Sequence, residues 1–427
     1  MKKYTLKNLN KKQIEKLLIR PSINFETVFE VVKNVMADVK ENGDKAITKY
    51  TERFDETKLD NFAVTEEEIT SACKRIPNET KKAFKEAAAN IEKFHKSQIE
   101  KCKEIETTRG VKCFQESRPI EKVGLYIPGG AAPLPSTVLM LAIPAKIAGC
   151  REMIMCTPPR VADIILYAAN LTGITKIFRI GGAQAIAALA YGTAQIPKVY
   201  KIFGPGNQYV TAAKMLASID PDGAALDMPA GPSEVLVIAD KYAKADFVAA
   251  DLLSQAEHST DSQVVLVCTD KNKTDEILKK VEKQLDELPR KEIAKKSLEE
   301  SFALITKTIE ESITFSNNYA PEHLIINVKN PNLYLKEIQN AGSVFIGQYS
   351  CESAGDYASG TNHTLPTYGY AKMYSGISTD NFTKKITFQE LSMEGVQNLG
   401  PIVEKMAETE DLQGHKNAMS IRLKSLS

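Results

Sequence analysis

The chain has 427 residues, of which 43% are hydrophobic and 26% are charged, and its 55 Lys and Arg residues nearly balance 54 Asp and Glu residues. This balance argues against a nucleic-acid partner, and no apolar run approaches the ~20 residues of a membrane-spanning helix. The length is ample for roughly two to four domains with buried cores.

The N-terminus and the cysteines both bear on the compartment. The opening segment, MKKYTLKNLNKKQIEKLL, is basic but lacks the apolar core of a signal peptide. The seven cysteines are scattered and form no C-x-x-C pair, which suits reduced thiols better than a disulfide framework. We therefore expect a cytoplasmic protein.

The first hundred residues have a helical period. Apolar residues recur at three- and four-residue steps through NFETVFEVVKNVMADVKENGDKAITKYTERFD and again through NETKKAFKEAAANIEKFHKSQIEK. This period predicts packing helices over residues 1 to about 103. His95 lies in the second segment among Lys and Glu residues, and we expect its side chain at the surface.

From Val123 the pattern changes to apolar runs that alternate with helical segments. Four strand-loop-helix units follow within fewer than 100 residues, which predicts a parallel sheet with helices on its faces. Their glycine-rich loops follow strands, where open α/β sheets bind ligands. Neither GPGNQY nor IGGAQA completes the G-x-G-x-x-G fingerprint, so each loop suits a phosphate-binding helix N-terminus and an ordinary turn about equally.

A second alternation follows DMPAGPSE and continues to SVFIG, and from about Met373 one or two helices end the chain. The expected fold class is therefore α/β, with two Rossmann-like lobes and helical extensions at both ends. We expect an N-terminal helical arm (1–22), a helical region (23–120) that belongs with a later α/β lobe (238–372), an α/β lobe between them (121–237) and a C-terminal tail (373–427).

Four of the five histidines lie at the edge of a predicted element beside another polar group. Gln255 and His258 are three residues apart on a predicted helix and share a face, although an exposed polar helix end is the simpler interpretation. Glu322 and His323 precede a strand, where a carboxylate and an imidazole suit proton transfer, although adjacent Glu and His are also common by chance.

The segment GDYASGTNHTLPTYG, residues 355–369, is predicted to be neither helix nor central strand, because it is rich in glycine and contains Pro366. Its Asp356 and His363 suit a hard or borderline metal ion, and turn capping is the alternative. His415, near Glu410, lies at a predicted helix boundary, and the alternative is that it only ends that helix. Nitrogen and oxygen groups without a thiolate cluster favour a catalytic over a structural zinc site.

In their order and spacing these segments closely resemble the histidinol dehydrogenase family. The resemblance covers nearly the whole chain from about residue 25 and rests on VGLYIPGG, FGPGNQYVTAAK, DGAALDMPAGPSEVLVIAD, DLLSQAEHS, APEHL, AGSVFIG, SAGDYASGTNHTLPTYGY and HKNAMSIRL. It implies a zinc-dependent oxidation of L-histidinol through L-histidinal to L-histidine with two NAD, the last steps of histidine biosynthesis.

The resemblance also implies roles for individual residues. His323 is the implied general base and Glu322 the group that activates water. The implied zinc ligands are Gln255, His258, Asp356 and His415. The implied substrate contacts are Ser233, Gln255, His258, His323, Asp356, His363, Glu410 and His415. The implied NAD contacts are Tyr126, Gln184 and Asn207.

The resemblance further implies that residues 121–237 bind the dinucleotide, that 238–372 form the catalytic lobe, and that 373–427 form a dimerisation tail. The tail would carry Glu410 and His415 to the active site of the partner in a homodimer. One alternative is a dehydrogenase of the same fold that acts on another alcohol, such as a sulfonated diol. Another is a non-catalytic metal-binding or ligand-sensing protein, against which the complete Glu322 and His323 pair weighs.

Overall fold

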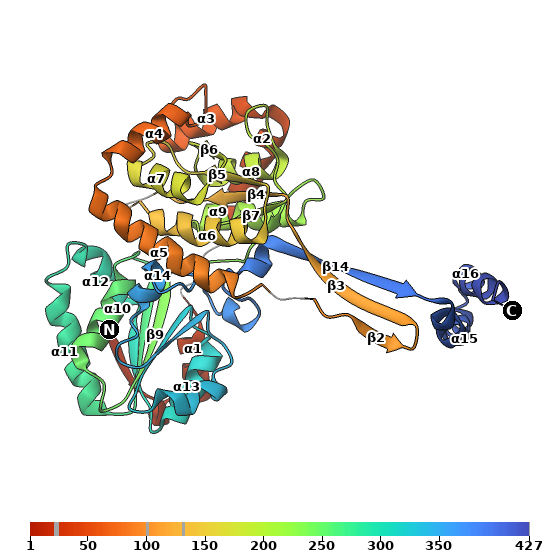
Figure 1. Cartoon of the computed structure of the whole chain (residues 1–427). Coiled ribbons are helices and arrows are strands. Elements are labelled where there is room, and N and C mark those ends of the chain that lie inside the picture. Colours follow the sequence, from red (N-terminus) through yellow and green to blue (C-terminus); the bar gives the residue numbers. More distant parts are fainter. Residues whose placement is uncertain (21–24, 100–101, 130–132, 427) are drawn as a thin grey trace.

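The computed structural model describes residues 1–20, 25–99, 102–129 and 133–426. Two lobes, each built on a parallel sheet with helices on both faces, lie against each other, and an arm projects from them (Figure 1). The expected α/β class with two parallel-sheet lobes is confirmed.

Sheet A forms the core of one lobe and has six parallel strands in the order β1-β11-β10-β9-β12-β13. The strands are β1 (Lys2–Thr5), β9 (Glu234–Ala239), β10 (Gln263–Cys268), β11 (Phe302–Ile305), β12 (His323–Asn327) and β13 (Ser343–Ile346). Every residue of β9 and β10 is buried, as the apolar runs in their sequences predict for strands covered on both faces.

Helices cover sheet A on both faces. One face carries α10 (Ala245–Ala256), α11 (Lys271–Leu285) and α12 (Lys291–Glu299). The other carries α1 (Lys11–Leu18) and α13 (Ile309–Tyr319), with the 3-10 turns η1 (Leu6–Asn8) and η2 (Pro331–Glu337). Successive residues of β9 serve the two cores in turn, since Val235 and Val237 face the first group and Leu236 and Ile238 the second.

Sheet B forms the core of the other lobe and has five parallel strands in the order β6-β5-β4-β7-β8. The strands are β4 (Lys122–Tyr126), β5 (Glu152–Cys156), β6 (Lys176–Phe178), β7 (Lys201–Phe203) and β8 (Ala225–Leu226). The helices that alternate with them are α6 (Pro135–Ala148), α7 (Asp163–Thr172), α8 (Gly182–Tyr191) and α9 (Gln208–Ile219).

The helices of residues 23–120 belong to sheet B, which contradicts the expectation that they complete the lobe of residues 238–372. These helices are α2 (Phe25–Asn42), α3 (Asp44–Asp55), α4 (Glu66–Arg75) and α5 (Asn78–Lys96). Val32, Val35 and Val39 of α2 share a core with α8 and α9, and Ile91 of α5 shares one with α6. An amphipathic helix has an apolar stripe, but nothing in its period states which sheet will cover that stripe.

Two further boundaries differ from expectation. Residues 1–22 were expected to be helical, whereas β1 pairs with β11 as an edge strand of sheet A. The boundary between residues 237 and 238 falls inside β9. The boundary at residues 22 and 23 lies outside the described residues.

The arm is built from three antiparallel strands and two terminal helices (Figure 1). β2 (Ile105–Thr108) pairs with β3 (Val111–Pro119), which pairs with β14 (Thr383–Leu391), and α15 (Met393–Thr409) and α16 (Gln413–Lys424) form the tip. Phe114 of β3 stacks on Phe388 of β14 with ring centroids 5.1 Å apart. This sheet joins segments more than 260 residues apart, and local periodicity did not predict it.

The remaining short elements are α14 (Glu352–Tyr357), η3 (Tyr370–Lys372) and η4 (Thr379–Phe382). In the part of the chain that the structure describes, no helix combines the length and apolar character that a membrane crossing requires.

Candidate active site

A small pocket of about 120 Å³ lies between the two lobes. We call it the interlobe pocket. Predicted site residues that line it are Ser233, Gln255, His258, Glu322, His323, Asp356 and His363. Thr137, Gly204 and Asp227 also line it, from the lobe of sheet B. The structure thus brings together side chains from distant segments, and their chemical roles stay predictions.

The interlobe pocket uses opposite edges of the two sheets. Glu322 and His323 lie where β12 begins, and Ser233 directly precedes β9, so sheet A presents its amino edge. Gly204 directly follows β7 and Asp227 directly follows β8, so sheet B presents its carboxyl edge. The glycine-rich loops of sheet B therefore lie where open α/β sheets bind ligands, while sheet A departs from that rule.

Gln255 and His258 stand at the carboxyl end of α10. Unpaired carbonyl groups at a helix C-terminus leave partial negative charge, which favours a cation. The amide nitrogen of Gln255 lies 2.9 Å from His323 Nδ1, whereas the described residues offer its Oε1 no hydrogen-bond partner. His258 follows the helix instead of lying within it, although its N–H still donates to the Gln255 carbonyl at 3.3 Å.

Glu322 and His323 are both buried, and each is held by the backbone of Glu234. Glu322 Oε2 accepts from the Glu234 N–H at 2.8 Å, and His323 Nδ1 lies 3.2 Å from the Glu234 carbonyl oxygen. Burial raises the pKa of Glu322. Burial by itself would lower the pKa of His323, but the surrounding carboxylates, Glu322 foremost, outweigh it and raise that pKa well above its ordinary value. The carboxylates around this imidazole would equally favour a cation.

Asp356 lies on α14, so the expectation that residues 355–369 exclude a helix is wrong at their start. The short helix places Glu352 one turn before Asp356. His258, Glu352 and Asp356 each offer an atom that could bind a metal, and these atoms all lie within 4.8 Å of one another. The glycines and Pro366 that follow prevent the helix from continuing.

The cluster contains an unusual number of unpaired polar atoms. Buried atoms with no hydrogen-bond partner in the described chain include Gln255 Oε1, His323 Nε2, Glu352 Oε2 and Asp356 Oδ1. His323 Nε2 lies 3.3 Å from Asp356 Oδ1, but not in hydrogen-bonding geometry. Leaving such atoms unpaired is costly, so their convergence fits a divalent cation that accepts nitrogen and oxygen ligands, such as zinc.

His363 joins the two lobes across the interlobe pocket. Its Nδ1 lies 2.9 Å from the Asp356 carbonyl oxygen and its Nε2 lies 3.1 Å from Thr137 Oγ1. The carbonyl accepts from Nδ1–H, so the neutral ring accepts from the Thr137 hydroxyl at Nε2. Burial lowers the pKa of His363, which favours this neutral form.

His95 corrects another expectation. It is fully buried rather than at the surface, with Nδ1 2.9 Å from the Ile91 carbonyl oxygen and Nε2 3.3 Å from the Asn362 amide nitrogen. Burial lowers its pKa. The charged residues around His95 in the sequence face outward, whereas the histidine faces the junction with the segment that follows α14.

Glu410 and His415 are not among the described residues that line the interlobe pocket. Glu410 directly follows α15 and His415 lies on α16, so both belong to the tip of the projecting arm (Figure 1). Both are exposed. Within a single chain the structure therefore does not bring these two predicted residues to the others.

A second, larger cavity of about 520 Å³ lies at the carboxyl edge of sheet B and is lined by Tyr126, Gln184 and Asn207. We call it the sheet B cavity. Tyr126 ends β4, and its hydroxyl accepts from the Gly182 N–H at 3.1 Å. Burial raises the pKa of Tyr126 to about 12, so this hydroxyl stays neutral. All three predicted NAD contacts thus share one cavity.

Asn207 has a structural task beside its predicted contact. Its Oδ1 caps α9 by accepting from the N–H groups of Tyr209 at 3.0 Å and Val210 at 3.1 Å. Asp55 is the sole charged side chain among the described residues that line the sheet B cavity. A cavity with so little charge suits a ligand held by shape and by neutral hydrogen bonds.

The loop between the two cavities is fixed by a buried ion pair. Gly204 donates its N–H to Asp227 Oδ2 at 2.8 Å, and Lys214 Nζ donates to the Gly204 carbonyl at 2.8 Å and also pairs with Asp227. Gly204 has φ +124°, and a Cβ there would lie 2.0 Å from the Tyr126 carbonyl oxygen. Only glycine therefore allows the loop to approach the end of β4 so closely.

Sequence reasoning missed several residues of this region, namely Thr137, Lys214, Asp227, Glu234 and Glu352. Glu352 left a usable signal, because it precedes Asp356 by four residues and such residues share one face of a helix. Thr137 and Asp227 left none, since each is an ordinary residue in a predicted helix or turn.

Comparisons with known proteins agree on one family. The sequence model of the family described as histidinol dehydrogenase matches residues 18–423. Histidinol dehydrogenase of Bacteroides thetaiotaomicron is 54% identical over 425 residues, which are 99% of each chain. That of Vibrio parahaemolyticus is 52% identical over 428 residues, covering 100% of this chain and 99% of the relative.

The solved structures give the same result. The crystal structure of histidinol dehydrogenase from Elizabethkingia anophelis superposes with a TM-score of 0.97 at 54% identity and covers 100% of this chain and 98% of that one. The arm is thus included in the similarity, together with both lobes. The chain belongs to the histidinol dehydrogenase family.

Proposed function

We propose that the protein oxidises L-histidinol through L-histidinal to L-histidine, with zinc and two molecules of NAD, in the last steps of histidine biosynthesis. The observation that carries the proposal is the convergence of unpaired buried atoms of Gln255, Asp356 and His323 in the interlobe pocket, beside Glu322. The names of relatives that match over nearly their full lengths support the choice of substrate.

The proposed zinc ligands are Gln255, His258 and Asp356, joined by His415 of the partner subunit. A bound zinc ion would supply the charge that holds the imidazole and amino nitrogens of the substrate and so orients its carbinol carbon. Gln255 is buried beside His323, and its amide nitrogen donates to the Glu234 carbonyl oxygen at 3.5 Å, which holds the amide in place. Oε1 is then the amide atom that remains for the metal.

In the first oxidation His323 takes the hydroxyl proton while a hydride leaves the carbinol carbon for NAD. The proton arrives at Nε2, which lines the pocket side of the ring near Asp356. For Nε2 to accept it, Nδ1 must carry the ring hydrogen, which it can donate to the Glu234 carbonyl oxygen at 3.2 Å. The product of this step is the aldehyde.

In the second oxidation Glu322 takes a proton from a water molecule that attacks the aldehyde carbon. His323 returns its proton to the aldehyde oxygen as the water attacks, which gives the neutral hydrate. The hydrate then loses a second hydride to another NAD and a proton to His323, which leaves the carboxylic acid. The raised pKa of Glu322, caused by burial, makes its carboxylate a stronger base than an exposed one. The small volume of the interlobe pocket, about 120 Å³, restricts escape of the reactive aldehyde.

The sheet B cavity is the proposed NAD site, with contacts from Tyr126, Gln184 and Asn207. The starts of α8 and α9 lie beside it, and free N–H groups at helix N-termini suit a pyrophosphate. The loop of residues 204–207 lines the interlobe pocket at Gly204 and the sheet B cavity at Asn207. It would therefore connect the dinucleotide with the substrate.

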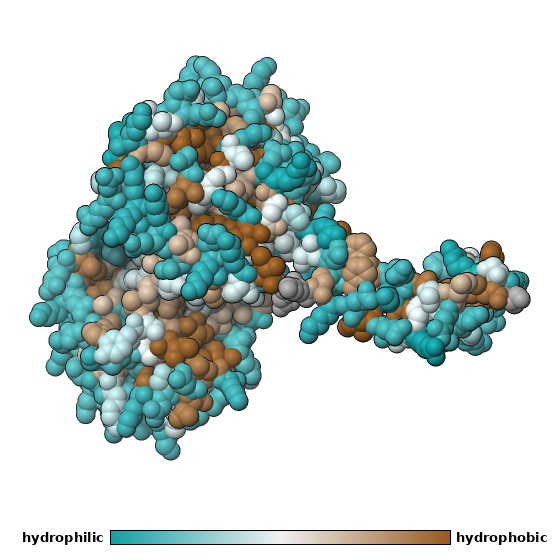
Figure 2. All heavy atoms as spheres, in the orientation of Figure 1, coloured by the Kyte–Doolittle hydropathy of each residue, from teal (hydrophilic) through white to brown (hydrophobic). Residues whose placement is uncertain are grey.

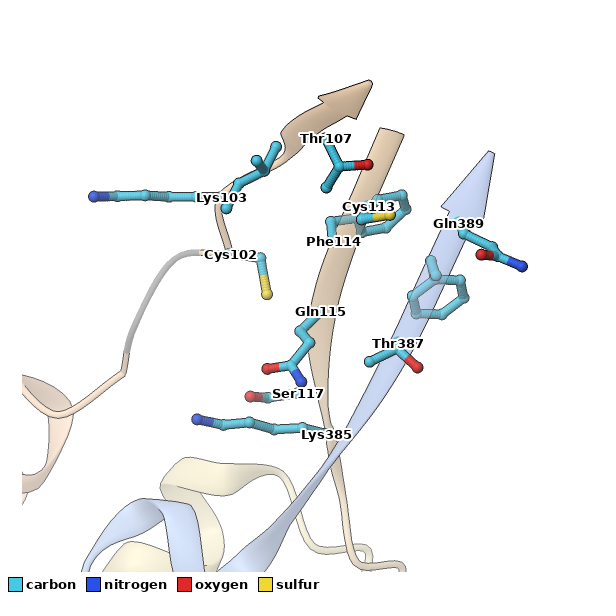
Figure 3. A pocket seen from close by; sticks show the side chains of 12 residues that line it. Cys102, Lys103, Thr107, Cys113, Phe114, Gln115, Ser117, Lys385, Thr387 and Gln389 are labelled. Carbon is cyan, nitrogen blue, oxygen red and sulfur yellow. The ribbon is translucent and has the colours of Figure 1, made fainter. Parts of the chain in front are cut away.

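The proposed assembly is a homodimer in which each tail completes the active site of the other chain. Exposed apolar side chains follow the arm and its tip (Figure 2): Ile105, Ile386, Met393, Ile402, Met406, Leu412 and Ile421. A hollow of about 1190 Å³ on the arm is lined by side chains of β2, β3 and β14, among them Phe114 and Thr387 (Figure 3). Exposed apolar side chains along a projecting arm support the proposal that a second copy of the chain covers this surface.

The decisive experiment compares NADH formation from L-histidinol with NADH formation from a small sulfonated diol, using zinc-loaded protein. We expect two NADH per histidinol consumed and at most slow turnover of the diol, because the diol lacks the imidazole. Turnover of the diol alone would show a dehydrogenase of the same fold with another substrate. No turnover of either compound would reject the proposed function.

A further inference from the structure

Glu352 is a buried carboxyl group that the proposed mechanism does not use. It is 1% exposed, and the described residues offer its Oε2 no hydrogen-bond partner. It lies on α14, one helical turn before Asp356, and one of its oxygens lies within 4.8 Å of the candidate ligand atoms of both His258 and Asp356. An unpaired carboxyl in such a place is costly unless a cation or a donor satisfies it.

A single chain supplies an incomplete set of the proposed zinc ligands. Gln255, His258 and Asp356 come from one chain, whereas His415 lies at the tip of the arm, remote from its own interlobe pocket. Zinc sites in proteins usually have four ligands, or three protein ligands and a water molecule. Glu352 is a further carboxyl that the same chain places beside His258 and Asp356.

We infer that Glu352 is a metal ligand that completes the zinc site within one subunit, in the place that His415 of the partner subunit takes after pairing. This inference rests on the proposed zinc-dependent function. It means that a subunit captures zinc before its partner docks, and that docking exchanges a carboxylate ligand for an imidazole. The exchange would also release Glu352 from the metal when the complete site forms.

Two other roles for Glu352 predict different results. As a positioning residue it would hydrogen-bond the second ring nitrogen of His258 and support that ligand whether or not His415 is present. As a purely structural residue it would remain a protonated carboxyl without influence on the metal. The three roles differ in whether the loss of zinc affinity on replacing Glu352 depends on the presence of His415.

The test is a double-mutant cycle on full-length protein stripped of metal. Zinc affinity is measured by competition with a chelator for the wild type, Glu352→Gln, His415→Asn and the double variant, and Co²⁺ replaces zinc to record the visible absorption of the site. Asp251→Asn is the control, because Asp251 is another buried acid whose charge acts on Glu352 but which is not part of the candidate metal cluster.

If each ligand substitutes for the other, each single substitution weakens zinc binding by about tenfold or less, whereas the double variant loses about a thousandfold, more than the product of the single effects. The Co²⁺ spectrum of His415→Asn should then change on adding Glu352→Gln. The Asp251→Asn control should bind zinc within about threefold of the wild type.

If the loss of zinc affinity in the double variant equals the product of the two single losses, the inference is overturned in favour of a positioning role. If Glu352→Gln binds zinc as tightly as the wild type, and the double variant binds it as tightly as His415→Asn, the inference is overturned in favour of a structural role. If the wild type itself binds neither Co²⁺ nor zinc at one ion per chain, the zinc-dependent function fails, and the inference fails with it. Thermal melting of each metal-free variant shows that the fold is retained.

Discussion

The two lobes have the same architecture but use opposite edges of their sheets. Sheet B presents its carboxyl edge, where α8 and α9 begin, whereas sheet A presents its amino edge, where α10 ends. Helix N-termini carry partial positive charge and suit an anionic dinucleotide, and a helix C-terminus carries partial negative charge and suits a cation. The same layered fold therefore supports two different kinds of ligand, depending on the edge used.

The two sites also differ in how their polar groups are satisfied. In the sheet B cavity the Tyr126 hydroxyl and the Asn207 side chain have backbone partners, and Gln184 Oε1 is the buried exception. In the interlobe pocket several buried atoms have no hydrogen-bond partner among the described residues. The site proposed for a metal ion thus keeps several unpaired atoms, whereas among the described residues the site proposed for the dinucleotide keeps only Gln184 Oε1 unpaired.

The largest expected effect comes from removing the metal. Chelation should abolish histidinol oxidation while both lobes stay folded, because the proposed ligands come from segments of already packed cores. Activity and circular dichroism of the same stripped sample check this, with zinc added back as the control. Full activity in the metal-free sample would show that the reaction does not need the metal. Unfolding of that sample would show that the metal holds the lobes together.

The second prediction concerns the base at the amino edge of sheet A. His323→Asn should lower kcat by about 10²- to 10⁴-fold, because the substrate hydroxyl loses its proton acceptor. Zinc content and the affinity for NAD should stay near those of the wild type, since the sheet B cavity is unchanged. Full activity in this variant would show that His323 is not the base.

The third prediction tests whether the interlobe pocket is completed by His415 of the partner subunit. His323→Asn and His415→Asn should each be nearly inactive, but together they should recover about a quarter of wild-type activity after co-expression, because half of the dimers would contain one intact site of two. Each variant expressed alone is the control. No recovery, in dimers shown to be mixed, would mean that His415 serves its own chain.

The fourth prediction concerns the buried acids beside sheet A. Burial raises the pKa of Asp251 to about 7 from an ordinary value of 3.8. The folded protein therefore retains a proton that the unfolded chain has released, and the free energy of unfolding falls as the pH rises from about 4 to about 7. Asp251→Asn should remove that loss, which is on the order of a few kcal/mol.

Urea unfolding of metal-free protein at about pH 5 and about pH 8 measures the difference. The fall in stability at the higher pH should be smaller in Asp251→Asn than in the wild type, because Glu322 keeps its raised pKa in both proteins. An equal difference in both proteins would show that Asp251 ionises normally in the folded state.

The smallest expected effect is at the carboxyl edge of sheet B. Asn207→Ala removes the cap of α9 and should cost about 1 kcal/mol of stability, whereas Asn207→Ser keeps a capping oxygen and should cost less. Both should raise KM for NAD if the side chain also contacts the dinucleotide. An increase in KM that appears only in the alanine variant would assign Asn207 to the cap alone.

Local patterns predicted the elements well where one period dominates. The buried runs of β9 and β10 and the alternation around sheet B follow directly from apolar residues that must leave water. His95 and α14 were missed for a related reason. One histidine among charged residues does not show which face it occupies, and a six-residue helix beside glycines has too few residues to establish a period.

The sequence by itself determined that two α/β lobes form, and its long motifs determined the family. Only the tertiary structure decided that α2 to α5 cover sheet B, that Glu352 joins His258 and Asp356, and that Glu410 and His415 stand apart at the tip of the arm. Secondary structure follows from neighbours along the chain, whereas packing partners depend on which apolar faces meet after the chain has turned many times.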